Sequence, residues 1–258
     1  MDLELGNKVA IVTGSSRGIG KYIAKRLAAE GCRLTICARG GERLRETAEE
    51  IEKGGASVLA LEADLSEKDA PQKIVDRTVE RFGQVDILVS NVGGNRRKPF
   101  EDTTDDDWET VLDLNLRAHV RSGRAVAPHM KAAGGGAILF VASIFGREAG
   151  GAGLSIYNAT KSALISTAKI MALELAPAGI RVNSIAPGSI RFPGGSWDRR
   201  VREQPEQMKA FVAQNLPVGR FGKAEEVADV AAFLVSERAS LVTGVCLNVD
   251  GGQSRSLI

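Results

Sequence analysis

The stretch Val9-Ala10-Ile11-Val12-Thr13-Gly14-Ser15-Ser16-Arg17-Gly18-Ile19-Gly20 decides the fold. Its first five residues form an apolar run typical of a buried β-strand, and residues 19–30 follow with a pattern typical of an amphipathic helix. Glycines between a strand and a helix let the backbone approach a ligand closely. The helix N-terminus adds free N–H groups and the positive end of the helix dipole. The stretch is compatible with a tight structural turn, but its context favours a cradle for a pyrophosphate group.

Outward from this stretch, short apolar runs alternate with longer amphipathic stretches. The runs are continuously apolar, as expected for strands buried on both faces, and strand–helix alternation predicts a parallel sheet with right-handed crossovers. The sequence therefore predicts one doubly wound α/β domain of the Rossmann type over residues 1–258, with a seven-stranded, mostly parallel sheet and helices on both faces. We expect strands over 9–13, 34–38, 58–61, 85–90, 138–143, 182–186 and 245–249, and helices over 19–30, 42–53, 70–82, 105–131, 155–176 and 227–235.

Composition excludes several classes of protein. The 258 residues include 34 basic and 32 acidic side chains, and this balance gives no electrostatic footprint for nucleic acid. The acidic N-terminus is unlike a signal peptide, and no apolar stretch approaches the roughly 18 residues of a membrane span. The three cysteines lack metal-ligand spacing. We therefore expect a cytoplasmic protein with no metal site and no nucleic-acid or membrane partner.

One irregular stretch, residues 188–215, interrupts the alternation. It combines Pro193, two glycines, Trp197 and a charged, helix-like piece. Long loops of this kind inside a regular domain are usually functional. We therefore expect a lid over a bound ligand.

The end of the second expected strand bears on the choice of coenzyme. Many dinucleotide sites place an acidic residue there, which binds the adenine-ribose 2′-hydroxyl. Arg39 stands at this point, and a guanidinium can hold a 2′-phosphate by paired hydrogen bonds. Arg17, in the glycine-rich turn, could reach the same phosphate. Each arginine alone is equally compatible with a solvated surface charge, but together they predict NADP(H) rather than NAD(H).

A tyrosine and a lysine suggest acid–base chemistry. Tyr157 and Lys161 are four residues apart, so a helix would bring both to one face. A nearby ammonium favours the phenolate and should lower the tyrosine pKa, which suits proton exchange with a substrate oxygen. Ser143 ends the fifth expected strand, where its hydroxyl could hold the same oxygen. The Tyr-x3-Lys spacing alone is compatible with a plain surface pair. Its combination with the glycine-rich turn is informative.

Together these spaced motifs resemble the short-chain dehydrogenase/reductase family over nearly the whole chain. Further elements match in the family's order: Asp64-Leu65, Asn91-Val92-Gly93-Gly94, Asn115 and Pro187-Gly188. The resemblance implies catalytic roles for Asn115, Ser143, Tyr157 and Lys161. It implies that the cofactor is bound by Gly14, Ser16, Arg17, Gly18, Ile19, Gly20, Arg39, Asp64, Leu65, Asn91, Gly93, Tyr157, Lys161, Pro187, Gly188 and Ile190.

The resemblance also implies a mechanism, a hydride transfer between a nicotinamide and a substrate carbon. Tyr157 would exchange a proton with the substrate oxygen, Ser143 would orient that oxygen, and Lys161 would hold the nicotinamide ribose. Asn115 would support a water that leads to the lysine. One departure concerns the lid, because Phe192 stands where the family often has a cofactor-contacting threonine.

The substrate is left open by the sequence, which resembles 3-oxoacyl-carrier-protein reductases and sugar-alcohol dehydrogenases about equally. Carrier reductases commonly place basic residues in the turns that here read 132–136 and 177–179, and neither turn has one. This favours a free small carbonyl or alcohol substrate over a carrier-bound acyl chain of fatty-acid synthesis. A non-catalytic sensor or scaffold is a remote alternative, because such proteins often lose the tyrosine or the lysine.

Other side chains have two interpretations each. Basic residues near the expected site could favour an anionic substrate or form a solvated or oligomer-facing cluster: Arg96, Arg97, Lys98, Arg191, Arg199, Arg200 and Arg202. Phe192 and Trp197 could form a pocket wall or the core of the lid. His119 and His129 lack a partner pattern, so we expect neither to be catalytic. The resemblance implies a homotetramer or homodimer, in which Leu257 and Ile258 would be buried.

Overall fold

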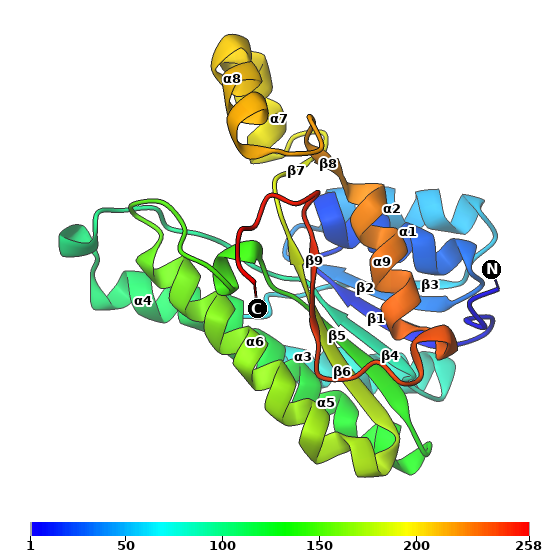
Figure 1. Cartoon of the computed structure of the whole chain (residues 1–258). Helices are drawn as coiled ribbons and strands as arrows, with labels where there is room; N and C mark the ends of the chain where they lie inside the picture. The colour runs from blue at the N-terminus through cyan, green and yellow to red at the C-terminus, as the bar shows by residue number, and fades with distance from the viewer. Residues whose placement is uncertain (1, 258) are drawn as a thin grey trace.

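The computed structural model describes residues 2–257, and within them a seven-stranded sheet forms the centre of the molecule (Figure 1). Neighbouring strands pair in parallel throughout, so the predicted doubly wound α/β sheet is confirmed. In spatial order the strands are β3 (Val58–Glu62), β2 (Arg33–Ala38), β1 (Val9–Thr13), β4 (Ile87–Ser90), β5 (Gly136–Val141), β6 (Ile180–Pro187) and β9 (Cys246–Val249).

The strand order reverses between β1 and β4. β1 pairs with β2 on one side and with β4 on the other, although β4 lies more than seventy residues further along the chain. Loops that leave the two strands diverge at such a point, and ligands of open α/β sheets bind in the crevice that this creates. The glycine-rich turn after β1 and the Asn91–Gly94 loop after β4 therefore face each other across this crevice.

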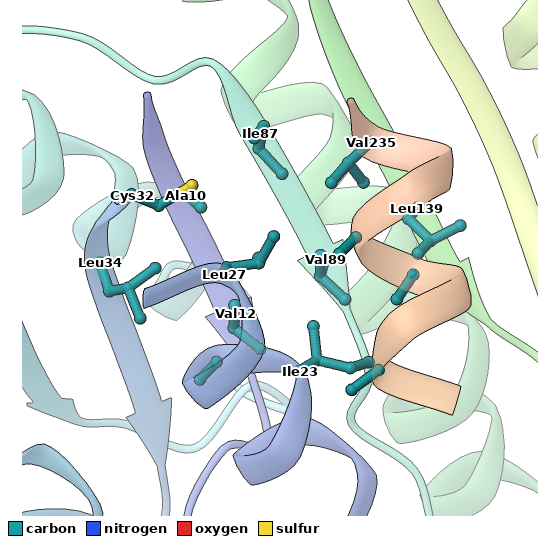
Figure 2. Packing of buried hydrophobic residues seen from close by; sticks show 14 of the residues in the cluster. Ala10, Val12, Ile23, Leu27, Cys32, Leu34, Ile87, Val89, Leu139 and Val235 are labelled. Atoms are coloured by element: carbon teal, nitrogen blue, oxygen red, sulfur yellow. The ribbon is translucent and has the colours of Figure 1, made fainter. Parts of the chain in front are cut away.

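Helices cover both faces of the sheet because the central strands β1, β4 and β5 are apolar and buried on both sides. Figure 2 shows Ile23 and Leu27 of a helix on one face packed over Val12 and Val89 of the strands. This face is covered by α1 (Gly18–Ala29), α2 (Gly41–Lys53) and α9 (Ala224–Val235). The other face is covered by α3 (Ala70–Phe82), α5 (Ala118–Ala132) and α6 (Ser155–Leu175).

The helix expected over 105–131 is interrupted. α4 (Asp105–Leu112) starts at a capping box formed by Thr104 and Asp107, and α5 starts at Ala118. Between them, Asp113–Arg117 forms a π-helical segment. Such π-bulges often occur at functional sites because they re-aim a side chain, and here the segment contains the buried Asn115.

The irregular stretch is more ordered than predicted. Two short helices, α7 (Ser196–Glu203) and α8 (Pro205–Asn215), stand out from the sheet in Figure 1, and β7 (Ile190–Arg191) pairs with β8 (Gly222–Lys223) at their base. We call residues 190–223 the arm. Trp197 packs with its ring centroid 4.8 Å from Phe211 and 5.2 Å from Phe221. Trp197 therefore belongs to a small core within the arm.

The cysteines lie where apolar side chains are expected. Cys32 and Cys37 are buried, and burial raises the pKa of each thiol to about 12, so both stay protonated. Among residues 2–257, no three histidine, cysteine or acidic side chains gather as a set that could hold a metal ion. Within the same range, no helix combines the length and apolarity needed to cross a bilayer.

Candidate active site

The glycine-rich turn has the geometry of an anion cradle. Gly14 and Gly18 have φ values of +65° and +57°, which favour glycine, and a Cβ on Gly20 would lie 2.4 Å from the Gly14 carbonyl oxygen. Ser15 Oγ fixes the turn by donating to the Val12 carbonyl at 2.7 Å. α1 begins at Gly18 without a side-chain cap. Its first N–H groups are therefore available to a phosphate.

A cleft of about 410 Å³ runs from this turn across the carboxyl ends of the central strands. It also includes Leu114 beside the π-helical segment and Phe192 of the arm. Most of the predicted cofactor residues line it together: Gly14, Ser16, Arg17, Gly18, Ile19, Arg39, Asp64, Leu65, Asn91 and Gly93. Six predicted residues lie outside its lining. Gly20 is in the same turn, and the others are on α6 or at and just after the end of β6: Tyr157, Lys161, Pro187, Gly188 and Ile190.

Two exposed arginines line the cleft: Arg17 in the glycine-rich turn and Arg39 just after β2. Within residues 2–257, neither side chain forms an ion pair or hydrogen bond. Arg39 nevertheless influences Asp64. Burial raises the pKa of this carboxyl, but hydrogen bonds from Ser66 N and Oγ, at 2.9 and 2.7 Å, together with the charge of Arg39, lower it overall. The guanidinium of Arg39 therefore lies near the far end of the cleft, free to take a further anion.

The serine, tyrosine and lysine meet at the start of α6. Ser143 forms a side-chain hydrogen bond with Tyr157, and Lys161 Nζ lies 5.9 Å from the Tyr157 ring centroid. Lys161 is buried, and its Nζ donates to the Val141 carbonyl at 2.9 Å. The sequence pattern correctly predicted that these three side chains converge.

The prediction that Lys161 lowers the Tyr157 pKa was wrong. Burial raises the pKa of Tyr157, and the Ser143 hydrogen bond only partly opposes this. Lys161 does not counteract burial because its ammonium is directed at the Val141 carbonyl, and burial lowers its own pKa to about 8. Tyr157 is therefore held in its protonated form, as a proton donor.

Asn115 fixes the loop after β4. Its Oδ1 accepts from Gly94 N at 2.8 Å, and its Nδ2 donates to the Gly94 carbonyl at 2.9 Å and to Thr160 Oγ1 at 3.2 Å. A Cβ on Gly93 would lie 3.5 Å from Lys161 Nζ. The same Cβ would lie 3.4 Å from Asn115 Oδ1, so Asn115 and Lys161 both approach Gly93. The water that the resemblance implies between Asn115 and the lysine stays a prediction.

Phe192 lies against the glycine-rich turn. A Cβ on Gly18 would lie 2.7 Å from the Phe192 ring, and one on Gly195 would lie 2.8 Å from it. The ring is packed at the edge of the buried cluster that includes α1. The substitution of phenylalanine for the usual threonine therefore gives the arm an apolar contact with the cofactor turn.

The C-terminal tail reaches the same edge of the sheet, which sequence reasoning missed. Ser189 N donates to Gln253 Oε1 at 2.7 Å, next to Gly188. Glu148 Oε2 accepts from Ser254 Oγ at 3.0 Å and from Arg255 N at 2.9 Å. No local pattern predicts these contacts because they join residues 64 to 107 positions apart in the sequence. Leu257 is fully exposed in the single chain, and Ile258 lies outside the described residues.

Most of the basic residues singled out in the sequence have partners within the chain. Arg96 and Lys98 both bind the buried Asp107, at 2.8 and 2.6 Å, and hold its pKa well below the usual range. Arg191 and Arg202 share Asp198, each at 3.1 Å. Arg97 Nε donates to the Ala152 carbonyl, and Arg200 lies over the Trp197 ring. These basic residues therefore anchor the loops and the arm, and binding of an anionic substrate is not needed to explain their positions.

A cleft of about 480 Å³ lies at the opposite edge of the sheet, beside Lys8, Asp86 and Arg181. The charged side chains of this cleft already form hydrogen bonds within the fold. Arg181 donates to the carbonyls of Leu234, Ser236 and Val242, and Asp86 accepts from Val9 N. We therefore take the carboxyl edge as the candidate active site.

Comparison with known proteins agrees with this geometry. A family model described as enoyl-(acyl carrier protein) reductase matches residues 14–254. Dehydrogenase/reductase SDR family member 4 of Oryctolagus cuniculus is 37% identical over 254 residues, which cover 96% of this chain and 94% of the relative. The chain belongs to the short-chain dehydrogenase/reductase family. As a member, it is an oxidoreductase that interconverts CH–OH and C=O groups.

Solved short-chain dehydrogenase/reductase structures share the whole fold. L-sorbose reductase from Gluconobacter frateurii, complexed with NADPH and L-sorbose, has a TM-score of 0.94 and 35% identity, and the match covers 100% of both chains. A 7α-hydroxysteroid dehydrogenase, complexed with NADH and 7-oxo glycochenodeoxycholic acid, has a TM-score of 0.91 and 32% identity, over 100% of this chain and 98% of the other. The family resemblance predicted from the spaced motifs is confirmed.

Proposed function

We propose that the protein is an NADP(H)-dependent reductase or dehydrogenase of a free small molecule that carries a ketone or a secondary alcohol. The observation that carries this proposal is the meeting of Ser143, Tyr157 and Lys161 beside the cleft of the glycine-rich turn. A non-catalytic sensor would not require a buried lysine next to a tyrosine that is kept protonated. The test is to mix the protein with NADPH and a panel of ketones and follow NADPH oxidation. No turnover across the panel with either coenzyme would contradict the proposal.

The chain's own residues divide the chemical work. When bound, the nicotinamide cofactor supplies or accepts the hydride. Ser143 and Tyr157 share a hydrogen bond and would both contact the substrate oxygen. Tyr157, kept protonated by burial, would donate its proton as negative charge develops on that oxygen, and would take the proton back in the oxidative direction. Lys161 would orient the nicotinamide ribose, and Asn115 would hold the loop beside it.

The remaining assigned residues would bind the cofactor along its length. The turn from Gly14 to Gly20 would take the pyrophosphate, and Asp64-Leu65 would contact the adenine. Pro187, Gly188 and Ile190 would flank the nicotinamide, with Asn91 and Gly93 opposite. Arg17 and Arg39 would take the 2′-phosphate, and this assignment is supported by the absence of any ion pair or hydrogen bond of either side chain within the described residues. L-sorbose reductase was solved with NADPH and the hydroxysteroid dehydrogenase with NADH, so our choice of NADP(H) for this chain rests on these two side chains.

A free substrate is favoured by the turns at residues 132–136 and 177–179. Neither contains a basic residue, whereas acidic carrier proteins rely on basic groups for steering and register. The description of the matching family model keeps a carrier-bound acyl chain as the alternative. A free 3-oxo thioester should be compared with the same acyl group on its carrier. A rise in kcat/KM of more than about tenfold on the carrier, roughly 1.4 kcal/mol of docking energy, would favour the alternative.

For the whole chain we propose one domain over residues 1–258, with residues 188–215 as a lid, assembled as a cytoplasmic homotetramer. Exposed apolar side chains on two separate surfaces support assembly. Ile170 and Leu173 are 51% and 62% exposed on α6, and Leu247 is 41% exposed on the edge strand β9. A dimer would use one of these surfaces and a tetramer would use both.

A further inference from the structure

His119 is buried beside the candidate site, and the mechanism above does not use it. It lies in α5, four residues after Asn115, and its side chain is inaccessible to solvent. Its ring packs edge-on against Phe140, with centroids 5.7 Å apart. Its Nε2 lies 2.9 Å from the carbonyl oxygen of Val92.

The surroundings of His119 fix its protonation state. Burial and the nearby charge of Lys161 lower its pKa to about 3, against the smaller opposing effect of the Val92 and Ser90 backbone. The imidazole is therefore neutral, with one N–H. Because a carbonyl can only accept a hydrogen bond, that N–H is on Nε2. Nδ1 is buried and makes no hydrogen bond of normal geometry within residues 2–257, although the Ser90 backbone lies close enough to affect the His119 pKa. The hydrogen bond with Val92 is therefore the contact that anchors the ring.

Val92 belongs to the loop that separates the glycine-rich turn from Lys161. On the turn side, Asn91 Nδ2 donates to the carbonyls of Thr13 and Gly14, both at 3.2 Å. Backbone N–H groups of Asn91 and Val92 donate to Thr13 Oγ1, at 2.9 and 3.4 Å. The turn therefore holds the first half of the loop.

On the opposite side, two side chains one helical turn apart hold the same loop. Asn115 binds both backbone groups of Gly94, and His119 binds the carbonyl of Val92. Gly93 lies between these two anchors and faces Lys161 Nζ. Without the His119 hydrogen bond, Asn115 would hold the loop from the α5 side through Gly94. Gly93, which lines the cleft, would then no longer be kept at a fixed distance from Lys161.

We propose that His119 is a positioning residue, whose neutral Nε2–H holds the Val92 carbonyl so that the Asn91–Gly94 loop keeps its place between the cofactor turn and Lys161. It acts through the loop and does not touch reacting atoms. Its link to turnover rests on the proposed function, because the loop lines the cleft assigned there to the cofactor. A purely structural histidine would change the stability of the fold and leave the folded protein's affinity for the cofactor unchanged.

The experiment compares His119→Leu, which removes the donor, with His119→Gln, which keeps an N–H donor. His129→Leu, in the same helix, is the matched control for loss of a histidine. We expect NADPH to bind about tenfold more weakly to His119→Leu, the usual effect of one lost hydrogen bond. Turnover by His119→Leu should also fall. His119→Gln should recover most of the NADPH affinity and most of the turnover. Melting temperatures report stability separately.

Histidine ¹⁵N chemical shifts provide a readout that is independent of activity. The chain has two histidines, so His129→Leu leaves one signal to assign. We expect the Nε2–H tautomer to persist from about pH 9 to about pH 5, well below the usual titration of histidine. An Nδ1–H tautomer, or titration in that range, would overturn the proposal even if His119→Leu failed to fold. The proposal would also be overturned if folded His119→Leu bound NADPH as tightly as the parent does. Failure of the parent to turn over any carbonyl would count against the proposed function alone, since binding and ¹⁵N shifts remain measurable.

Discussion

At the scale of single residues, the proposed choice of coenzyme rests on Arg17 and Arg39, whose side chains form no ion pair or hydrogen bond among residues 2–257. Arg39→Asp replaces the guanidinium that follows β2 by a carboxylate. It should remove a charge-assisted phosphate contact of roughly 1.5–3 kcal/mol, about one to two decades in affinity. We expect kcat/KM with NADPH to fall by that factor while kcat/KM with NADH holds or rises. The unaltered protein working equally well with NADH would contradict the assignment.

His119 also makes a prediction about acid stability. Its pKa is about 3 in the folded chain and 6.5 as the ordinary value, so between these values the unfolded chain binds a proton that the folded chain does not. Stability therefore falls as pH drops from 6.5 toward 3. His119→Gln cannot titrate, so its denaturation midpoint should fall less steeply than that of the parent over this window, measured with urea at stepped pH. Parallel curves for the two proteins would show that His119 titrates normally.

The catalytic part of the candidate site could be predicted because its residues are placed by local sequence spacing. Tyr157 and Lys161 share a helix face, and Ser143 follows a strand that ends at the same edge, so their meeting follows from periodicity and topology. The direction of the Lys161 ammonium could not be predicted, because its partner is the Val141 carbonyl of β5, twenty residues earlier in the chain. The same holds for His119 and Val92. Arg96 and Lys98 were ambiguous for the same reason, since Asp107 becomes their neighbour only in the folded chain.

At the scale of elements, the strands were the most predictable part. β1 spans the predicted residues 9–13, because a strand buried on both faces must be apolar throughout. The arm was predicted only as an irregular lid with one charged, helix-like piece. Its helices are short and polar outside, and they bury their apolar residues against each other, so no long periodic pattern marks them. The π-helical segment was also missed, since it is set by the contacts of Asn115 with a distant loop.

Phe192 joins the arm to the glycine-rich turn of the body. Phe192→Ala should release the ring from Gly18 and Gly195, and a loss of about 1.5 kcal/mol would make opening of the arm roughly tenfold more frequent. We expect faster proteolysis within residues 190–223 and a changed Trp197 emission in a Trp108→Phe background. Phe100→Ala, at a largely exposed phenylalanine elsewhere, is the control. Equal cleavage rates in both variants would mean that Phe192 does not secure the arm.

At the scale of the whole molecule, the exposed apolar side chains predict assembly. We expect four chains per particle by light scattering at micromolar concentration. Leu173→Glu on α6 and Leu247→Glu on β9 should each reduce the mass by half, because a buried carboxylate at either surface is strongly unfavourable. Phe100→Glu should leave the mass unchanged. A monomeric parent would contradict the proposal, and with it the predicted burial of Leu257 and Ile258.

The central claim is that Tyr157 donates the proton in an NADPH-dependent carbonyl reduction. Tyr157→Phe removes one hydroxyl and leaves the packing of α6 intact, so it separates chemistry from folding. The most direct measurement is turnover of the best ketone by parent and variant, with NADPH affinity determined on the same samples. The account predicts that the variant binds NADPH like the parent and loses at least about a hundredfold in kcat, the usual contribution of a positioned general acid. Turnover within a few-fold of the parent would show that another group donates the proton.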